Sequence, residues 1–164
     1  MKAVRYHQTG PIDVLRYEDV PDPTPGPGDA VVRVKAAALN RLDIFLRSGA
    51  AAMPGFKMPH TGGFDIAGEI AAVGPEVDPA RVGQAVVVHA RVTGPKARGN
   101  LDLIGTSRPG GFAEYVLAPA DRLAPKPAHY SFEEAAAFGC VYITAYYGLI
   151  LHAAVRSNRQ ASPA

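Results

Sequence analysis

The sequence has 164 residues, 48% of them hydrophobic and 20% charged, and a formal net charge of +2. This is the profile of one globular domain, not of a disordered chain. No run of Lys and Arg exceeds a pair, so the charge pattern does not predict nucleic-acid binding. No apolar stretch is long enough to span a bilayer, and the N-terminus lacks the apolar core of a signal peptide, so we expect no membrane contact and a cytoplasmic location.

The first third of the chain is predicted to form short strands joined by turns. Residues 2–7 and 14–20 are typical of two strands, and Gly10-Pro11 between them indicates a hairpin. Residues 21–28 hold four prolines, which lack the N–H group that a central strand or a helix needs. They therefore predict a stiff surface connection. Residues 30–37 alternate apolar and basic side chains, which indicates a half-buried strand.

Residues 40–48 change to helical spacing, with an apolar stripe opposite a polar one. Asn40, Asp43 and Arg47 fall on the polar face. Asp43 and Arg47 are spaced to form a surface ion pair worth about 0.3–0.5 kcal/mol. Asn40 is equally well explained as a helix N-cap. Spacing alone leaves open whether these residues form an ordinary polar face or part of a site.

The rest of the chain predicts further short strands and two helices. Ser131 and Glu134 form a capping box that predicts a helix running to about Phe138. Residues 91–109 are irregular, basic and rich in Gly and Pro, which indicates a loop or lobe. The strands follow one another without intervening helices, which favours a largely antiparallel barrel or sandwich with helices at one end. The remaining expected elements are strands at 66–74, 85–89, 112–118 and 121–124 and a second helix at 142–153.

Few motifs carry chemistry by themselves. Asp65 follows Gly62-Gly63-Phe64, where it is either a turn carboxylate or a site residue. Cys140 is a lone thiol in an apolar context, which indicates a small buried side chain and excludes an internal disulfide. The dinucleotide-binding Gly-x-Gly-x-x-Gly motif, the phosphate-binding P-loop and the Gly-x-Ser-x-Gly motif of serine hydrolases do not occur.

Read together, several segments resemble the medium-chain dehydrogenase/reductase superfamily, nearest its quinone-oxidoreductase branch. Their order and spacing over residues 1–154 carry the resemblance, more than any one of them. The matching segments are Met1-Lys-Ala-Val-Arg, the block from Pro21 to Ala37, Asn40-Arg-Leu-Asp-Ile-Phe-Leu-Arg-Ser-Gly, Gly63-Phe-Asp-Ile-Ala-Gly, Val73-Gly, Gly110-Gly-Phe-Ala-Glu-Tyr-Val, Ser131-Phe-Glu-Glu-Ala-Ala-Ala and Ile143-Thr-Ala-Tyr-Tyr-Gly-Leu.

The resemblance implies a mainly β fold, a GroES-like partly open barrel with a few short helices, over residues 1–154. In the family this domain forms one wall of the active-site cleft, and a Rossmann domain carrying NADPH forms the other. By resemblance, Asn40 lies near the nicotinamide and Thr144 lies against the cofactor. We take Asn40 and Asp43 as the catalytic candidates. The expected cleft residues are Phe45, which stands where the family often has a tyrosine, together with Phe64 and Asp65.

The same resemblance predicts that zinc is absent. Zinc-dependent relatives have a cysteine at the position of Asn40, a histidine at the position of Phe64 and a cysteine at the position of Cys140. An amide and a phenyl ring thus replace two of the three principal ligands, and neither anchors zinc as a thiolate or an imidazole does. Residues 91–109 resemble a shortened form of the family's four-cysteine zinc lobe, without its cysteines.

We expect a truncated NADPH-dependent oxidoreductase that, when complete, transfers hydride to a quinone, an enone or a carbonyl compound. Residues 155–164 are polar and are expected to be a disordered tail, in place of the strand and glycine motif that open a Rossmann domain. This chain alone is then expected to bind no cofactor. The alternative is a non-catalytic GroES-like binding or assembly module, or half of a split enzyme. The expected partners are a second copy of the chain or a separate Rossmann-domain chain.

Overall fold

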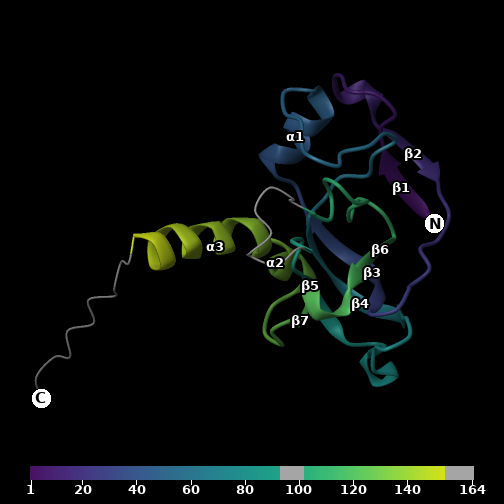
Figure 1. The fold of residues 1–164 in the computed structure, drawn as a ribbon, viewed down its shortest axis with the longest axis vertical. Coiled ribbons are helices and arrows are strands. Elements are labelled where there is room, and N and C mark those ends of the chain that lie inside the picture. The colour runs from purple at the N-terminus through teal and green to yellow at the C-terminus, as the bar shows by residue number, and fades with distance from the viewer. Residues whose placement is uncertain (93–101, 154–164) are drawn as a thin grey trace, which may run out of the picture.

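The computed structural model describes residues 1–92 and 102–153 and is built mostly from β-strands. Figure 1 shows the strands gathered in one body, with a long helix extending from it toward the C-terminus. The strands are β1 (Lys2–Arg5), β2 (Arg16–Asp19), β3 (Asp29–Ala38), β4 (Asp65–Val73), β5 (Ala85–Val88), β6 (Tyr115–Pro119) and β7 (Leu123–Pro125). The helices are α1 (Arg41–Ser48), α2 (Phe132–Ala136), α3 (Gly139–Tyr146) and a π-helical turn, η4 (Tyr147–His152).

Five strands form one open antiparallel sheet in the order β6-β3-β4-β5-β7, and β1 and β2 form a separate hairpin. The sheet does not close on itself, so the predicted partly open, mainly β architecture is confirmed. The hairpin predicted from Gly10-Pro11 is also confirmed, with Lys2 opposite Asp19 and Arg5 opposite Arg16. Three 3₁₀ turns, at Ile12–Val14, Pro79–Arg81 and Ala120–Arg122, connect strands.

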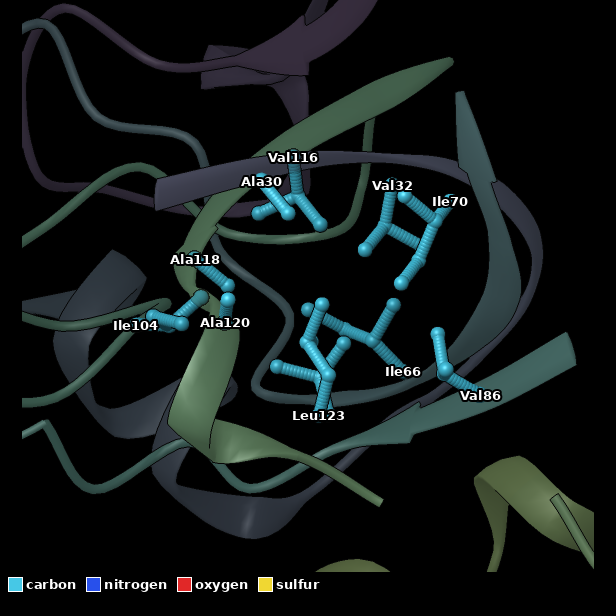
Figure 2. Close-up of a cluster of buried hydrophobic side chains, with 11 residues drawn as sticks. Ala30, Val32, Ile66, Ile70, Val86, Ile104, Val116, Ala118, Ala120 and Leu123 are labelled. Atoms are coloured by element: carbon cyan, nitrogen blue, oxygen red, sulfur yellow. The ribbon is translucent and has the colours of Figure 1, made fainter. Parts of the chain in front are cut away.

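The core lies on the concave side of the sheet, where side chains from all five strands meet (Figure 2). Branched aliphatic residues fill it, as expected for short strands with one buried face. Ile104, which lies outside the strands, joins this cluster and is fully buried in it. The buried members are Ala30, Val32, Ile66, Ile70, Val86, Val88, Ile104, Val116, Ala118, Ala120 and Leu123.

Strand β4 passes unusually close to β3 at Gly68. A Cβ atom on Gly68 would lie 2.1 Å from the carbonyl oxygen of Arg33, so only glycine fits there. The pairing register shifts nearby, between Val34 and Ala36, as expected for a β-bulge. Beyond this bulge the pairing continues to the first residue of β4, Asp65, which lies opposite Ala38.

The helices differ from the sequence predictions mainly at their ends. The capping box of α2 is confirmed: the Glu134 amide donates to the Ser131 hydroxyl, and the Ser131 amide donates to the Glu134 carboxylate. The helix ends at Ala136, before the predicted Phe138, because its buried face is only Ala135 and Ala136 packed on Ala67 of β4. The predicted strand at 121–124 is a 3₁₀ turn followed by β7.

The second predicted helix begins at Gly139, three residues earlier than expected, and its last part is π-helical. Its residues are apolar on every face, so the sequence offers no periodicity from which to place its ends. Large apolar side chains along it are 39–60% exposed, and Figure 1 shows the helix projecting away from the sheet. This helix is therefore the largest unpartnered apolar element in the part of the chain that the structure describes.

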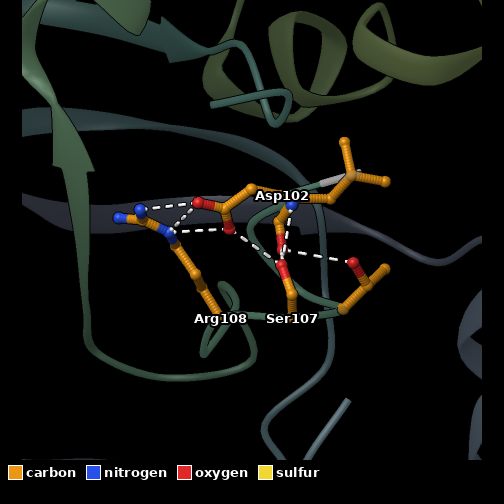
Figure 3. Close-up of polar contacts among 5 residues, drawn as sticks. Asp102, Ser107 and Arg108 are labelled. Atoms are coloured by element: carbon orange, nitrogen blue, oxygen red, sulfur yellow. Dashed lines mark hydrogen bonds and ion pairs between the residues drawn. The ribbon is translucent and has the colours of Figure 1, made fainter. Parts of the chain in front are cut away.

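The predicted loop at 91–109 is described at its two ends, and residues 93–101 lie outside the described residues, as does the predicted tail at 155–164. The second end is a tight polar turn (Figure 3). Arg108 donates to both carboxylate oxygens of Asp102, at 2.7–3.0 Å, and the Ser107 hydroxyl donates to the same carboxylate at 2.8 Å. These contacts fix the turn that carries Leu103 and Ile104.

Stability is expected to depend on His60, a buried histidine between Tyr6 and Phe56 whose Nε2 lies 3.0 Å from the Gly105 carbonyl oxygen. Burial lowers its pKa below the ordinary 6.5. The unfolded chain then takes up a proton at His60 before the folded chain does, so the free energy of unfolding falls as pH drops below about 6.5.

His60→Gln removes this proton uptake, and we expect a flatter decline in unfolding free energy between pH 7.5 and 5.5, measured by urea denaturation. His129→Gln, which removes an exposed histidine, serves as the control and keeps the wild-type slope. Equal slopes in His60→Gln and the wild type would contradict this assignment.

Candidate functional site

A cleft of about 630 Å³ lies where α1, the end of β5 and α3 meet. Each wall comes from a different part of the chain, so only the folded sheet brings them together. Most of the lining is apolar, with a few polar and charged groups among it. The lining residues are Asn40, Arg41, Leu42, Phe64, Asp65, Val88, His89, Ala90, Arg91, Leu103, Gly139, Cys140, Ile143, Thr144 and Tyr147.

Asp65, the first residue of β4, organises the base of this cleft. Its Oδ2 accepts a hydrogen bond from Asn40 Nδ2 at 2.9 Å, and its Oδ1 accepts one from the Cys140 amide at 2.7 Å. A Cβ atom on Gly139 would lie 2.2 Å from Asp65 Oδ1, so glycine is needed for α3 to approach the carboxylate. One buried carboxylate thus connects β4 with the starts of α1 and α3.

Asp43 performs a similar function one layer behind the cleft. Its Oδ2 accepts from the Asn40 amide and its Oδ1 accepts from the Gly63 amide, each at 2.9 Å. Gly63 has a φ of 89°, in the left-handed region that favours glycine, and a side chain there would strike Phe112. Asp43 thus holds the backbone of both Asn40 and the Gly62-Gly63 turn that leads into Phe64 and Asp65.

Burial raises the pKa of both carboxyl groups above its ordinary value. The hydrogen bonds from Gly63 and Asn40 to Asp43, and from Asn40 and Cys140 to Asp65, oppose this rise. Burial, followed by the Asp65 carboxylate, raises the pKa of the Cys140 thiol. Cys140 therefore stays a thiol at neutral pH and is a poor nucleophile.

The structure brings four of the six predicted site residues to the cleft: Asn40, Phe64, Asp65 and Thr144. Asp43 is buried, and its carboxylate accepts the two backbone hydrogen bonds given above. It lines a separate cavity of about 340 Å³ on the other side of α1.

Phe45 does not line this cleft, and its role in a cleft completed by a second domain stays a prediction. Its ring is 41% exposed and packs under the Arg41 guanidinium, 5.8 Å away, because it falls on the solvent side of α1. The ion pair suggested for Asp43 and Arg47 is also replaced, since Arg47 donates instead to the Gly10 carbonyl oxygen.

Sequence reasoning missed the wall that follows β5. His89, Ala90 and Arg91 line the cleft because β5 ends at Val88 and the chain then turns along the cleft edge. No periodicity marks these residues, since the strand is apolar on both faces. The only available signal was a pair of basic side chains directly after an apolar run.

The three residues matched by resemblance to zinc ligands, Asn40, Phe64 and Cys140, do share this cleft. Phe64 offers no donor atom, and the Asn40 amide nitrogen is already bonded to Asp65. Among residues 1–92 and 102–153, no three His, Cys, Asp or Glu side chains converge as a metal site would require. The residues present do not fit the tetrahedral zinc site of the family's metal-dependent members, and freedom from zinc stays a prediction.

Residues 26–128 match the model of the alcohol dehydrogenase GroES-like domain. The chain belongs to this family. It is thereby a member of the medium-chain dehydrogenase/reductase superfamily, as the sequence resemblance predicted, and the GroES-like fold is confirmed.

The family includes curated relatives and solved structures that this chain resembles over almost its full length. A quinone oxidoreductase from Lama guanicoe is 33% identical over 159 residues, which cover 96% of this chain and 43% of the relative. A 2-methylene-furan-3-one reductase from Solanum lycopersicum is 34% identical over 153 residues, 91% of this chain and 37% of the relative. The crystal structure of an NAD-dependent alcohol dehydrogenase superposes with a TM-score of 0.88 at 38% identity, covering 95% of this chain and 48% of that one.

These relatives are named as oxidoreductases, reductases and dehydrogenases. The chain spans less than half the length of the relatives that it matches. In the ranges that the structure describes, no helix has the length and apolar character needed to cross a membrane. A cytoplasmic location stays a prediction.

The Asn40–Asp65 hydrogen bond is expected to stabilise the fold as well as the cleft. Asn40→Ala leaves a buried carboxylate oxygen without its donor, which costs about 1–3 kcal/mol of unfolding free energy. Because Asp65→Ala removes the same bond, the double variant is expected to lose less than the sum of the single losses. Urea denaturation of the four proteins measures this coupling.

Arg33→Ala, combined with Asp65→Ala, gives a matched control, since Arg33 is exposed and makes no contact with the carboxylate. That pair is expected to be additive within about 0.5 kcal/mol. Additivity between Asn40→Ala and Asp65→Ala as well would show that the bond contributes nothing to stability.

Proposed function

We propose that this chain supplies the substrate-side wall of an NADPH-dependent oxidoreductase that reduces a quinone, an enone or a carbonyl compound. The cleft is the observation that carries the proposal, because Asn40, at the start of α1, and Thr144, on α3, line the same mostly apolar hollow. The names of the relatives, a quinone oxidoreductase and an enone-type reductase, support this acceptor class. The other wall is contributed by a nucleotide-binding domain, in the same polypeptide or in a second one.

Residues of this chain would bind and orient the acceptor, and the cofactor supplies hydride when it is bound. Asp65 and Asp43 act as positioning residues. Asp65 holds the Asn40 amide group, and Asp43 holds the backbone on which Asn40 sits. Thr144 lies one helical turn after Cys140, at the edge where a cofactor-carrying wall would meet the cleft. The apolar side chains of Leu42, Phe64 and Ile143 exclude water from the reacting atoms.

The exposed apolar side chains of α3 and η4 support the need for a second wall. Their apolar side chains are exposed on all sides, directly beside the cleft. Patches of this kind are rarely left exposed in a monomeric protein. A nucleotide-binding domain packed on this helix would cover the patch and close the cleft at the same time.

A chimera tests the proposal: this chain followed, after residue 153, by the nucleotide-binding half of the Lama guanicoe quinone oxidoreductase. We expect it to oxidise NADPH with 1,2-naphthoquinone, followed at 340 nm, while the chain alone gives only background. Asn40→Ala and Thr144→Ala should each lower kcat by roughly 10- to 100-fold, because small displacements in the site are costly. Thr24→Ala, in the exposed proline-rich connection, is the control and keeps full activity.

NADPH binding by the chimera, measured by its fluorescence, shows that the second half is folded. A chimera that binds NADPH but reduces no quinone, enone or aldehyde would overturn the proposed function. Turnover by the chain alone would overturn the requirement for a second wall.

The exposed apolar helix also favours a second candidate function, a non-catalytic assembly module that pairs through α3 and η4. In that case, the full chain is expected to sediment as a dimer, and Ile150→Lys should return it to a monomer. Leu39→Lys, which charges a 75% exposed leucine just after β3 and outside the apolar helix, should leave the dimer intact. A monomer at all concentrations in analytical ultracentrifugation would exclude this function.

A further inference from the structure

The wall that follows β5 carries a positive charge that the proposed mechanism does not use. Arg91, Arg41 and His89 all line the cleft. Within residues 1–92 and 102–153, neither arginine forms an ion pair with a carboxylate. The Arg91 Nε is buried and has no hydrogen-bond acceptor among those residues. Buried donors in folded proteins almost always have a partner, so the unpartnered Nε marks Arg91 as the side chain of the lining whose guanidinium a ligand in the cleft would pair with.

The segments outside the described residues contain no carboxylate side chain that could pair with Arg91. Residues 93–101 and 154–164 contain neither Asp nor Glu. The one acidic side chain in the cleft lining, Asp65, is 4% exposed, and each of its oxygens already accepts a hydrogen bond. The cleft therefore presents cations whose counter-charge is not supplied by its own lining.

The Arg91 backbone is held in place, which fixes the point from which its side chain extends. Arg91 pairs with Leu103 in an isolated β-bridge, and Leu103 belongs to the turn held by the Asp102 contacts. The carbonyl oxygen of Arg91 lies 3.3 Å from His89 Nδ1. Next to it, the cleft is lined by Val88, Ala90 and Leu103, which favour an apolar molecular body.

We propose that Arg91 binds an oxyanion carried by the acceptor, so that the preferred substrate is an apolar quinone, enone or carbonyl compound bearing a carboxylate. This inference rests on the proposed function and specifies the substrate class of the same cleft. A guanidinium suits a carboxylate because its donors match both oxygens of the planar group. Arg41 is the first residue of α1, and its guanidinium lies over the Phe45 ring. Its positive charge adds long-range attraction for an anion.

Amide chemical shifts of the full chain test the proposal, with benzoate as the probe and benzamide as its uncharged equivalent. Benzoate is expected to shift the amides of Arg91, Leu103 and Cys140, and benzamide to bind about tenfold more weakly, as fits loss of a charge-assisted hydrogen bond. Arg91→Gln should weaken benzoate binding about tenfold and leave benzamide unchanged. Arg33→Gln, which removes an exposed arginine on β3 away from the cleft, is the matched control and should change neither.

The phosphates of a nicotinamide cofactor are the other source of an oxyanion, and inorganic pyrophosphate tests it. If pyrophosphate displaces benzoate from these amides and Arg91→Gln abolishes its binding more strongly than that of benzoate, Arg91 serves the cofactor and the substrate assignment is wrong. Equal binding of benzoate and benzamide in the cleft would overturn the role of Arg91 while leaving the proposed function in place. Failure of both probes to shift any cleft amide, in a chimera that still turns over quinone, would overturn the carboxylate preference alone.

Discussion

The carboxylate of Asp65 holds together the segments on which the cleft depends. It accepts one hydrogen bond from the side chain of Asn40, at the start of α1, and one from the amide of Cys140, at the start of α3. These residues are 25 and 75 positions away in sequence. A buried carboxylate without such donors would be costly, since its charge has left water. The requirement for these donors therefore fixes where both helices begin relative to β4.

Glycines make this arrangement sterically possible. Gly139 leaves room for the Asp65 carboxylate, and Gly63 takes a positive φ where its turn passes Phe112. Gly105 and Gly110 pack against the backbone of the same turn, with no space for a Cβ atom on either. Because close backbone packing cannot be relieved by rotating a side chain, these positions tolerate substitution poorly. The polar network and the glycines thus form a single unit under the cleft.

The chemistry proposed for the cleft depends on which groups remain free after this unit has formed. Asp43 and Asp65 are occupied with internal hydrogen bonds, so they position other groups and do not face the acceptor. Arg91 and Thr144 line the cleft among apolar side chains, together with Asn40, whose Nδ2 is held by Asp65. The sheet and the C-terminal helices differ in the same respect. The apolar side chains of the sheet are buried in its own core, whereas those of α3 and η4 are exposed and could be covered by another surface.

Local sequence patterns were sufficient to predict the strand order along the chain, the proline-rich connection, the start of α1 and the capping box of α2, because these depend on local periodicity, turn residues and helix caps. Resemblance to a family then indicated Asn40, Phe64, Asp65 and Thr144, which meet in one cleft. Three placements became visible in the folded chain alone: Phe45 faces solvent, Arg47 contacts Gly10 instead of Asp43, and Arg91 lines the cleft. These placements depend on helix rotation and on where β5 ends against distant segments, and no local pattern in the sequence encodes either of them.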